Sequence, residues 1–155
     1  MKQLRLIALA GLLVASAHTA IVTAKDIAVP KMYMFGFAAS FNDSIVHMTE
    51  IQAVDSVWID QKNGFMLGRE NYSYQLRDFL TNNYQMAHRT CVVFYNRDRQ
   101  KLEKEYLKMK RIYTTGKKKV KKKDKGKAKT NNDLRILSSN DFQFHTVDMN
   151  IETDE

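Results

Sequence analysis

The histidines and the single cysteine are the residues of this chain best able to perform nucleophilic or metal chemistry. His47 precedes Glu50 by three positions, and His88 precedes Cys91 by the same interval. This spacing brings two side chains to one ligand on a helix, whereas on a strand positions i and i+3 point to opposite faces. Both pairs lie in or beside segments with strand-like alternation, so we expect no metal, no cofactor and no catalytic residue at either pair.

A polar and aromatic cluster at the start of a predicted helix is the second candidate site. Its members are Arg69, Tyr72, Tyr74 and Arg77. These side chains can line a small pocket, which would suit an enzyme with a cleft near the start of that helix. They can equally solvate the helix through local ion pairs, which are common and weak on protein surfaces. We favour the surface alternative and keep the pocket open.

A run of lysines is the strongest candidate for binding. Residues 117–129 hold nine lysines and one aspartate, in a chain of net charge +8. The lysines are Lys117, Lys118, Lys119, Lys121, Lys122, Lys123, Lys125, Lys127 and Lys129. The rest of the chain is therefore close to neutral, and the high isoelectric point belongs to one short tract.

This lysine tract would attract anionic polymers or membrane surfaces with a steep salt dependence. Anionic lipid headgroups contribute about 1 kcal/mol per lysine near the surface. The tract contains no aromatic residue and no arginine, so base stacking and bidentate base recognition are absent and no specific nucleic-acid recognition is expected. The alternative is a solvated loop insertion without a partner. Because the tract is low in complexity and has nothing apolar to bury, we predict a disordered loop at about 116–132.

The first residues have the pattern of an export signal. Lys2 and Arg5 form a basic start, and residues 6–15 are apolar but too few to span a bilayer. Small residues follow, and cleavage after Ala24 fits best because charged residues begin directly after it. We predict a signal peptide over 1–24 and export to the periplasm or beyond. An uncleaved membrane anchor is the alternative.

The elements that must position these groups alternate between strand and helix patterns. Residues 32–41 place Tyr33, Phe35, Phe37 and Phe41 on one face, which predicts a strand with one heavily buried face. Further strands are expected at 45–52 (running on towards 57–59), 90–95 and 142–147, with helices at about 72–83 and 97–113. Asn71 or Ser73 is expected to cap the first helix and Asn96 the second. Cys91, within the third strand, is expected to be a small buried residue.

These elements predict a single α+β domain over residues 25–155. The expected order is β-β-α-β-α-β, in which a sheet of about four strands carries both helices on one face. Four segments together resemble a group of small exported proteins of Gram-negative gut anaerobes to which no activity is assigned. They are residues 35–44, 51–60, 72–76 and 88–93. The resemblance implies an exported α/β domain and supplies no catalytic residue, and the lysine tract departs from the group.

The function predicted from the sequence is a non-enzymatic envelope or secreted binding module. Its polycationic loop would contact anionic polymers or membrane surfaces. A small periplasmic enzyme and a nucleic-acid-binding protein are the two alternatives.

Overall fold

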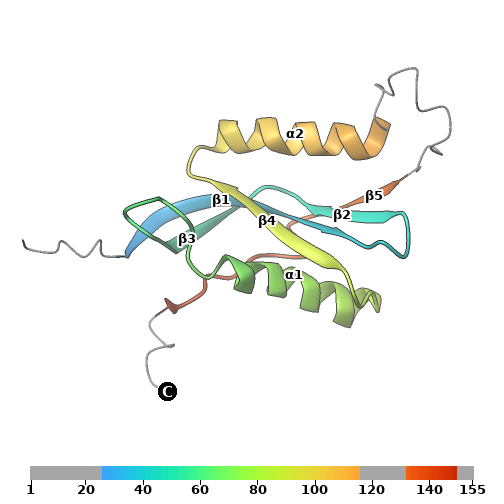
Figure 1. Cartoon of the computed structure of the whole chain (residues 1–155), viewed down its shortest axis with the longest axis horizontal. Coiled ribbons are helices and arrows are strands. Elements are labelled where there is room, and N and C mark those ends of the chain that lie inside the picture. The colour runs from blue at the N-terminus through green and yellow to red at the C-terminus, as the bar shows by residue number, and fades with distance from the viewer. Residues whose placement is uncertain (1–25, 116–131, 150–155) are drawn as a thin grey trace, which may run out of the picture.

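The computed structural model describes residues 26–115 and 132–149, which form one mixed sheet and two helices (Figure 1). The predicted signal peptide and the lysine tract lie outside these residues. In chain order the elements are β1 (Ile27–Ala39), β2 (Ile45–Thr49), β3 (Gln52–Ile59), α1 (Arg69–Tyr84), β4 (Thr90–Asn96), α2 (Arg99–Thr115) and β5 (Asp133–Leu137). The predicted α+β class is confirmed, with three strands before the first helix instead of two.

The long strand β1 is the centre of the sheet. It pairs antiparallel with β3 along 27–34, with β2 along 37–39 and with β4 along 33–39. Because β4 overlaps both other ranges, β2 and β3 share one edge of β1 and β4 occupies the other. β5 then pairs parallel with β2. The five strands therefore occupy four positions across the sheet, close to the predicted four-stranded arrangement.

The two helices cover opposite faces of the sheet, so the prediction of both helices on one face is wrong (Figure 1). Met32 and Met34 of β1 join the core under α1, whereas Phe35 and Phe37 join the core under α2. The strand is apolar on both sides, not on one, and a strand buried on both faces requires cover on both. Phe41, expected on the aromatic face, lies beyond the end of β1 and is fully exposed.

Gly36 of β1 allows α1 to lie directly on the sheet. A Cβ atom at this position would stand 2.6 Å from Leu76 Cδ2 of α1 and 3.1 Å from Phe144 Cζ. Both contacting side chains are buried. The glycine is therefore required by close packing and not by its backbone angle.

The last strand is not at 142–147, where alternation predicted it, but at β5. Residues 142–147 run beside β3 without forming a strand, and side chains of β3 and α1 form hydrogen bonds with their backbone instead. Gln52 Nε2 donates to the Phe142 carbonyl at 2.8 Å, and Phe144 N donates to Gln52 Oε1 at 2.9 Å. Phe142 and Phe144 are buried. Their alternation therefore reflects burial of two rings, which does not require strand pairing.

The helix starts also differ from prediction. α1 follows Gly68, which has φ 58°, and has no side-chain cap from Asn71 or Ser73. At α2 the capping side chain is Asp98, whose Oδ1 accepts hydrogen bonds from Gln100 N at 2.9 Å and Lys101 N at 3.3 Å. Asn96 instead accepts from Asp98 N, so it orders the turn that precedes the helix.

Candidate functional site

The predicted pocket at the start of α1 is not assembled from Arg69, Tyr72, Tyr74 and Arg77. Tyr72 points into the core, where its Oη accepts a hydrogen bond from Val147 N at 3.2 Å and burial raises its pKa. Tyr74 is exposed, and the Arg77 guanidinium lies 4.4 Å from the centre of its ring. Arg69 is also exposed. The cluster therefore divides between the core and the solvent.

Of the pairs His47/Glu50 and His88/Cys91, Glu50 bonds to a serine and Cys91 is partly buried. Glu50 accepts hydrogen bonds from the backbone and hydroxyl of Ser139. Burial raises the pKa of the Cys91 thiol to about 11, which keeps it protonated at neutral pH. Among residues 26–115 and 132–149 no group of three or more His, Cys, Asp or Glu side chains is arranged to hold a metal ion.

A stripe of cations on the solvent side of α2 is the feature that the fold does assemble. Leu102, Tyr106, Met109 and Tyr113 turn inward to the sheet. The opposite side carries Lys101, Lys104, Lys108 and Arg111, all exposed. Their spacing of three or four residues puts them in one row along about 15 Å of helix. We call these four residues the α2 stripe.

The α2 stripe is not fully neutralised by its own helix. α2 has six basic and two acidic residues. Glu103, one of the two acids, is 3.4 Å from Arg99, outside the stripe. Within the described parts of the chain, no carboxylate forms a salt bridge with any of the four stripe cations. Leu107 lies beside the stripe and is 58% exposed, so an apolar side chain accompanies the cations.

The α2 stripe leads directly to the lysine tract along the chain. Arg111 is one turn from Thr115, the last residue of α2, and the first lysine of the tract is Lys117. Sequence patterns did not single out the stripe because the charge of the tract dominated the composition. The signal was nevertheless present as four cations at helical spacing opposite an apolar face.

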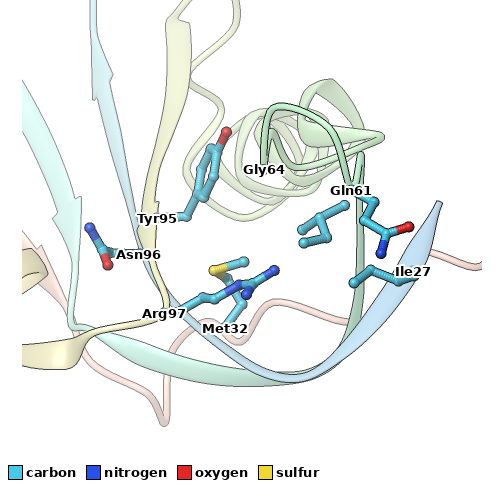
Figure 2. Close-up of a pocket in the computed structure, with 8 residues that line it drawn as sticks. Ile27, Met32, Gln61, Gly64, Tyr95, Asn96 and Arg97 are labelled. Atoms are coloured by element: carbon cyan, nitrogen blue, oxygen red, sulfur yellow. The ribbon is translucent and has the colours of Figure 1, made fainter. Parts of the chain in front are cut away.

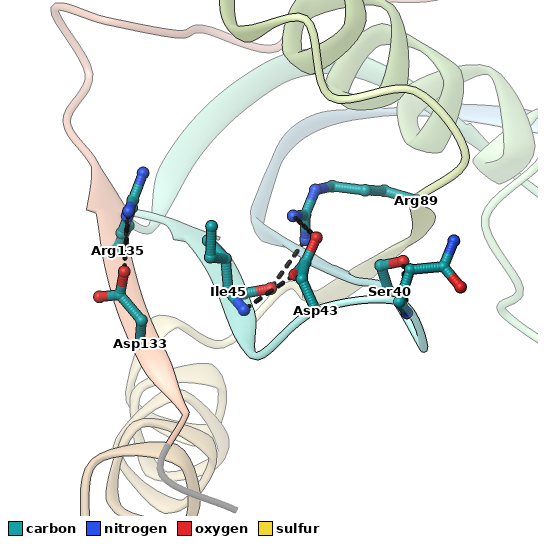
Figure 3. A network of polar contacts seen from close by, with 7 residues as sticks. Ser40, Asp43, Ile45, Arg89, Asp133 and Arg135 are labelled. Carbon is teal, nitrogen blue, oxygen red and sulfur yellow. Dashed lines mark hydrogen bonds and ion pairs between the residues drawn. The ribbon is translucent and has the colours of Figure 1, made fainter.

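A second polar assembly lies where β2, β4 and the turn after β1 meet (Figure 3). The side chain of Arg89 is 2% exposed, and it donates to the Ile45 carbonyl and to Asp43 Oδ2, each at 2.7 Å. Asp43 Oδ1 in turn accepts from Ile45 N at 2.9 Å. The backbone hydrogen bond from Ile45, together with Arg89, holds the pKa of Asp43 below its usual value. Arg89 therefore clamps the turn between β1 and β2.

His47 is buried beside this clamp. Strand register places it between Ala38 of β1 and Arg135 of β5, and it is 1% exposed. Neither ring nitrogen has a hydrogen-bond partner within the described residues. Burial, reinforced by Arg89 and Arg135, lowers the pKa of His47 to about 4. The ring is therefore neutral at pH 7, which suits a pH-sensitive structural position better than a general base.

Two open clefts flank the sheet. One, of about 450 Å³, has the Arg97 guanidinium as its one charged lining group (Figure 2). It is lined by Ile27, Met32, Ile59, Gln61, Gly64, Tyr95, Asn96 and Arg97. The other, of about 630 Å³, lies between α2 and the break that separates β2 from β3, and is lined by Glu50, Ile51, Arg99, Glu103, Tyr106 and Leu107. Neither includes a residue of the predicted α1 pocket, and the second cleft adjoins the α2 stripe through Leu107.

No family model matches the chain, and no curated protein or solved structure matches it either. The resemblance to small exported proteins therefore stays a prediction. Within residues 26–115 and 132–149, neither helix has the length and apolar character needed to cross a membrane.

Proposed function

We propose that this protein is an exported, non-enzymatic module that attaches to polyanionic surfaces through the α2 stripe and the lysine tract acting as one contact area. The α2 stripe is the observation that carries the proposal. It is a row of four exposed cations on one helix, and no carboxylate in the described part of the chain forms a salt bridge with them. Export is the part of the proposal that rests on the pattern of residues 1–24.

The chemistry of the contact area favours repeated anionic groups over any single ligand. Lysine ammonium groups act as hydrated point charges, which suits closely spaced phosphates, sulfates or carboxylates. Each cation near an anionic membrane contributes about 1 kcal/mol, and salt weakens the sum over a Debye length of about 8 Å at physiological ionic strength. The exposed Leu107 adds apolar contact with a lipid interface.

Binding of the predicted mature chain, from Lys25 onward, to vesicles is the direct test. Vesicles of phosphatidylcholine with and without phosphatidylglycerol separate charge from general lipid affinity, and heparin represents anionic polysaccharide. We expect retention on the anionic vesicles and on heparin at low salt, lost as salt rises. Equal binding to neutral and anionic vesicles would contradict the proposal.

Two charge-matched variants test whether the α2 stripe is responsible. The stripe variant replaces all four cations, as K101Q, K104Q, K108Q and R111Q. The control variant removes the same charge from exposed cations outside α2, as K31Q, K62Q, R69Q and R97Q. At about 1 kcal/mol per cation, the stripe variant should lose roughly three orders of magnitude in vesicle affinity at low salt, and the control less than about tenfold. Equal losses of affinity in the two variants would mean that the α2 stripe acts only through the net charge of the chain.

Deleting residues 117–129 tests the tract in the same assay. We expect a loss at least as large as that of the stripe variant, because the deletion removes nine lysines. If the deletion leaves binding at low salt unchanged, the tract is a solvated loop insertion without a role in binding. A preference for duplex DNA over both heparin and anionic vesicles would favour the nucleic-acid alternative.

A further inference from the structure

The outer strands of the sheet are protected very unequally. β5 carries Asp133 and Arg135 among its five residues, and charged side chains discourage pairing at an edge. β3 is shielded by the segment 142–147, from which Thr146 Oγ1 donates to the Asp55 carbonyl at 2.8 Å. β4 has neither charged side chains nor a described segment beside its outer edge.

β4 presents an uncharged and regular edge. Its seven residues are Thr-Cys-Val-Val-Phe-Tyr-Asn, without charge, proline or glycine. Its register with β1 runs unbroken from Tyr33 opposite Asn96 to Ala39 opposite Thr90, so no bulge twists the edge away. Alternate residues of a paired strand turn their backbone groups away from the partner. Within the described residues no segment forms backbone hydrogen bonds with that outer side of β4.

The surroundings leave this edge accessible. In Figure 1 β4 crosses the front of the sheet with α2 above it and α1 below it, and no described segment passes in front. Val92 is 39% exposed, and Cys91, Val93, Phe94 and Tyr95 are only partly buried. The neighbouring β1, in contrast, is buried from Met34 to Ala38. An apolar strand whose edge is accessible and unpaired can form hydrogen bonds with a further strand.

We propose that the β4 edge pairs antiparallel with the β4 edge of a second copy of this chain. The strand matches itself when two copies are antiparallel, and because β4 carries no charge the paired strands meet without repulsion. A two-fold axis at Val93 sets Thr90 opposite Asn96, so the polar ends match. The same axis sets Val92 opposite Phe94, a β-branched and aromatic pair of the kind that stabilises antiparallel sheets. The contact is isologous and closes as a dimer.

The pairing has a geometric consequence for binding. The two-fold axis stands perpendicular to the joined sheet, so both copies of α2 lie on one face and both copies of α1 on the other. Two α2 stripes then face the same direction, and a polyanionic surface can engage both at once. This consequence rests on the proposed function, whereas the pairing itself does not.

Sedimentation velocity of the chain from Lys25 onward tests the pairing, in a reducing buffer that excludes a Cys91 disulfide. We expect a dimer that dissociates on dilution. V92K puts a charge on the edge at an exposed position. It should raise the dimer dissociation constant roughly tenfold or more, because it replaces both Val92–Phe94 pairs and places two like charges diagonally across the two-fold axis. L107K makes the same kind of change at an exposed apolar residue of α2 and should leave the dimer intact.

T90K, at an exposed end of β4, provides a second edge variant if V92K does not fold, with circular dichroism as the check on folding. Hydrogen exchange should show alternate β4 amides protected in the wild-type dimer and unprotected in the edge variants. A wild-type chain that is monomeric at 200 µM would overturn the proposal, as would a dimer that survives the folded edge variants. Vesicle binding is measured separately on a monomeric edge variant. A variant that still binds anionic vesicles supports the proposed function whether or not the wild-type chain pairs through β4.

Discussion

Lowering the pH should destabilise the fold through His47. The ring is 1% exposed, and the charged groups that act on it are Arg89, Arg135, Asp133 and Asp43. Burial and the two arginines outweigh the two aspartates, so the folded pKa falls from 6.5 to about 4. Between pH 6.5 and pH 4, His47 is protonated in the unfolded chain and neutral in the folded chain. The stability contributed by the neutral ring is therefore complete above pH 6.5 and decreases as the pH falls towards 4.

The size of the effect follows from the shift in pKa. A difference of about 2.5 units between the unfolded and folded states corresponds to about 3 kcal/mol when fully expressed. By pH 4.5 about 2 kcal/mol of the free energy of unfolding should be lost, relative to pH 7. The titration of Asp43 does not overlap this window, because its pKa lies below its ordinary value of 3.8.

Urea unfolding at intervals from pH 7 to pH 4.5 measures the loss directly. His47→Leu removes the titrating group and two unpartnered ring nitrogens, so the variant should be at least as stable at pH 7 and nearly independent of pH over this range. H145Q, at an exposed histidine, is the matched control and should keep the wild-type dependence. A flat wild-type profile, or the same slope in His47→Leu, would refute the burial argument.

Three further predictions concern packing and reactivity. G36A should cost roughly 1–3 kcal/mol of stability by overpacking against Leu76, and its cost should be smaller in a chain that already carries L76A, as urea unfolding of the single and double variants will show. R89K keeps the buried charge, but a lysine cannot bond to Asp43 and to the Ile45 carbonyl with one planar group. The variant should lose roughly 1–3 kcal/mol of its free energy of unfolding, and its melting temperature should fall. An unchanged melting temperature would contradict the clamp. Because burial raises the pKa of Cys91 to about 11, iodoacetamide should modify the native thiol at pH 7.5 far more slowly than the thiol in urea, and equal rates would place it in solvent.

Local patterns in the sequence determined the kinds of element and most of their positions. The apolar period of Tyr72, Leu76 and Leu80 predicted α1, and these three residues are its buried side chains. The β-branched and aromatic run at 90–95 predicted β4 within one residue. The spacing of apolar residues is a local property of the sequence, and it predicts which side of an element is buried. The α+β class follows from the elements alone.

Tertiary structure decided what covers each face and which polar groups meet. Alternation could not distinguish a strand buried on one face from β1, because its methionines and its phenylalanines are both apolar and each set attracts a different helix. Nor could it distinguish a strand from the segment 142–147, whose backbone bonds to side chains far away in the sequence, such as Gln52, ninety residues before Phe142.

The same division applies to the functional residues. The lysine tract and the spacing of the α2 stripe are present in the sequence, since charge and helical period are local properties. The burial of His47 and the clamp of Arg89 on Asp43 depend on strand register and on a contact across 46 residues. The openness of β4 is likewise a property of the whole sheet, because an edge exists only where no other strand is placed.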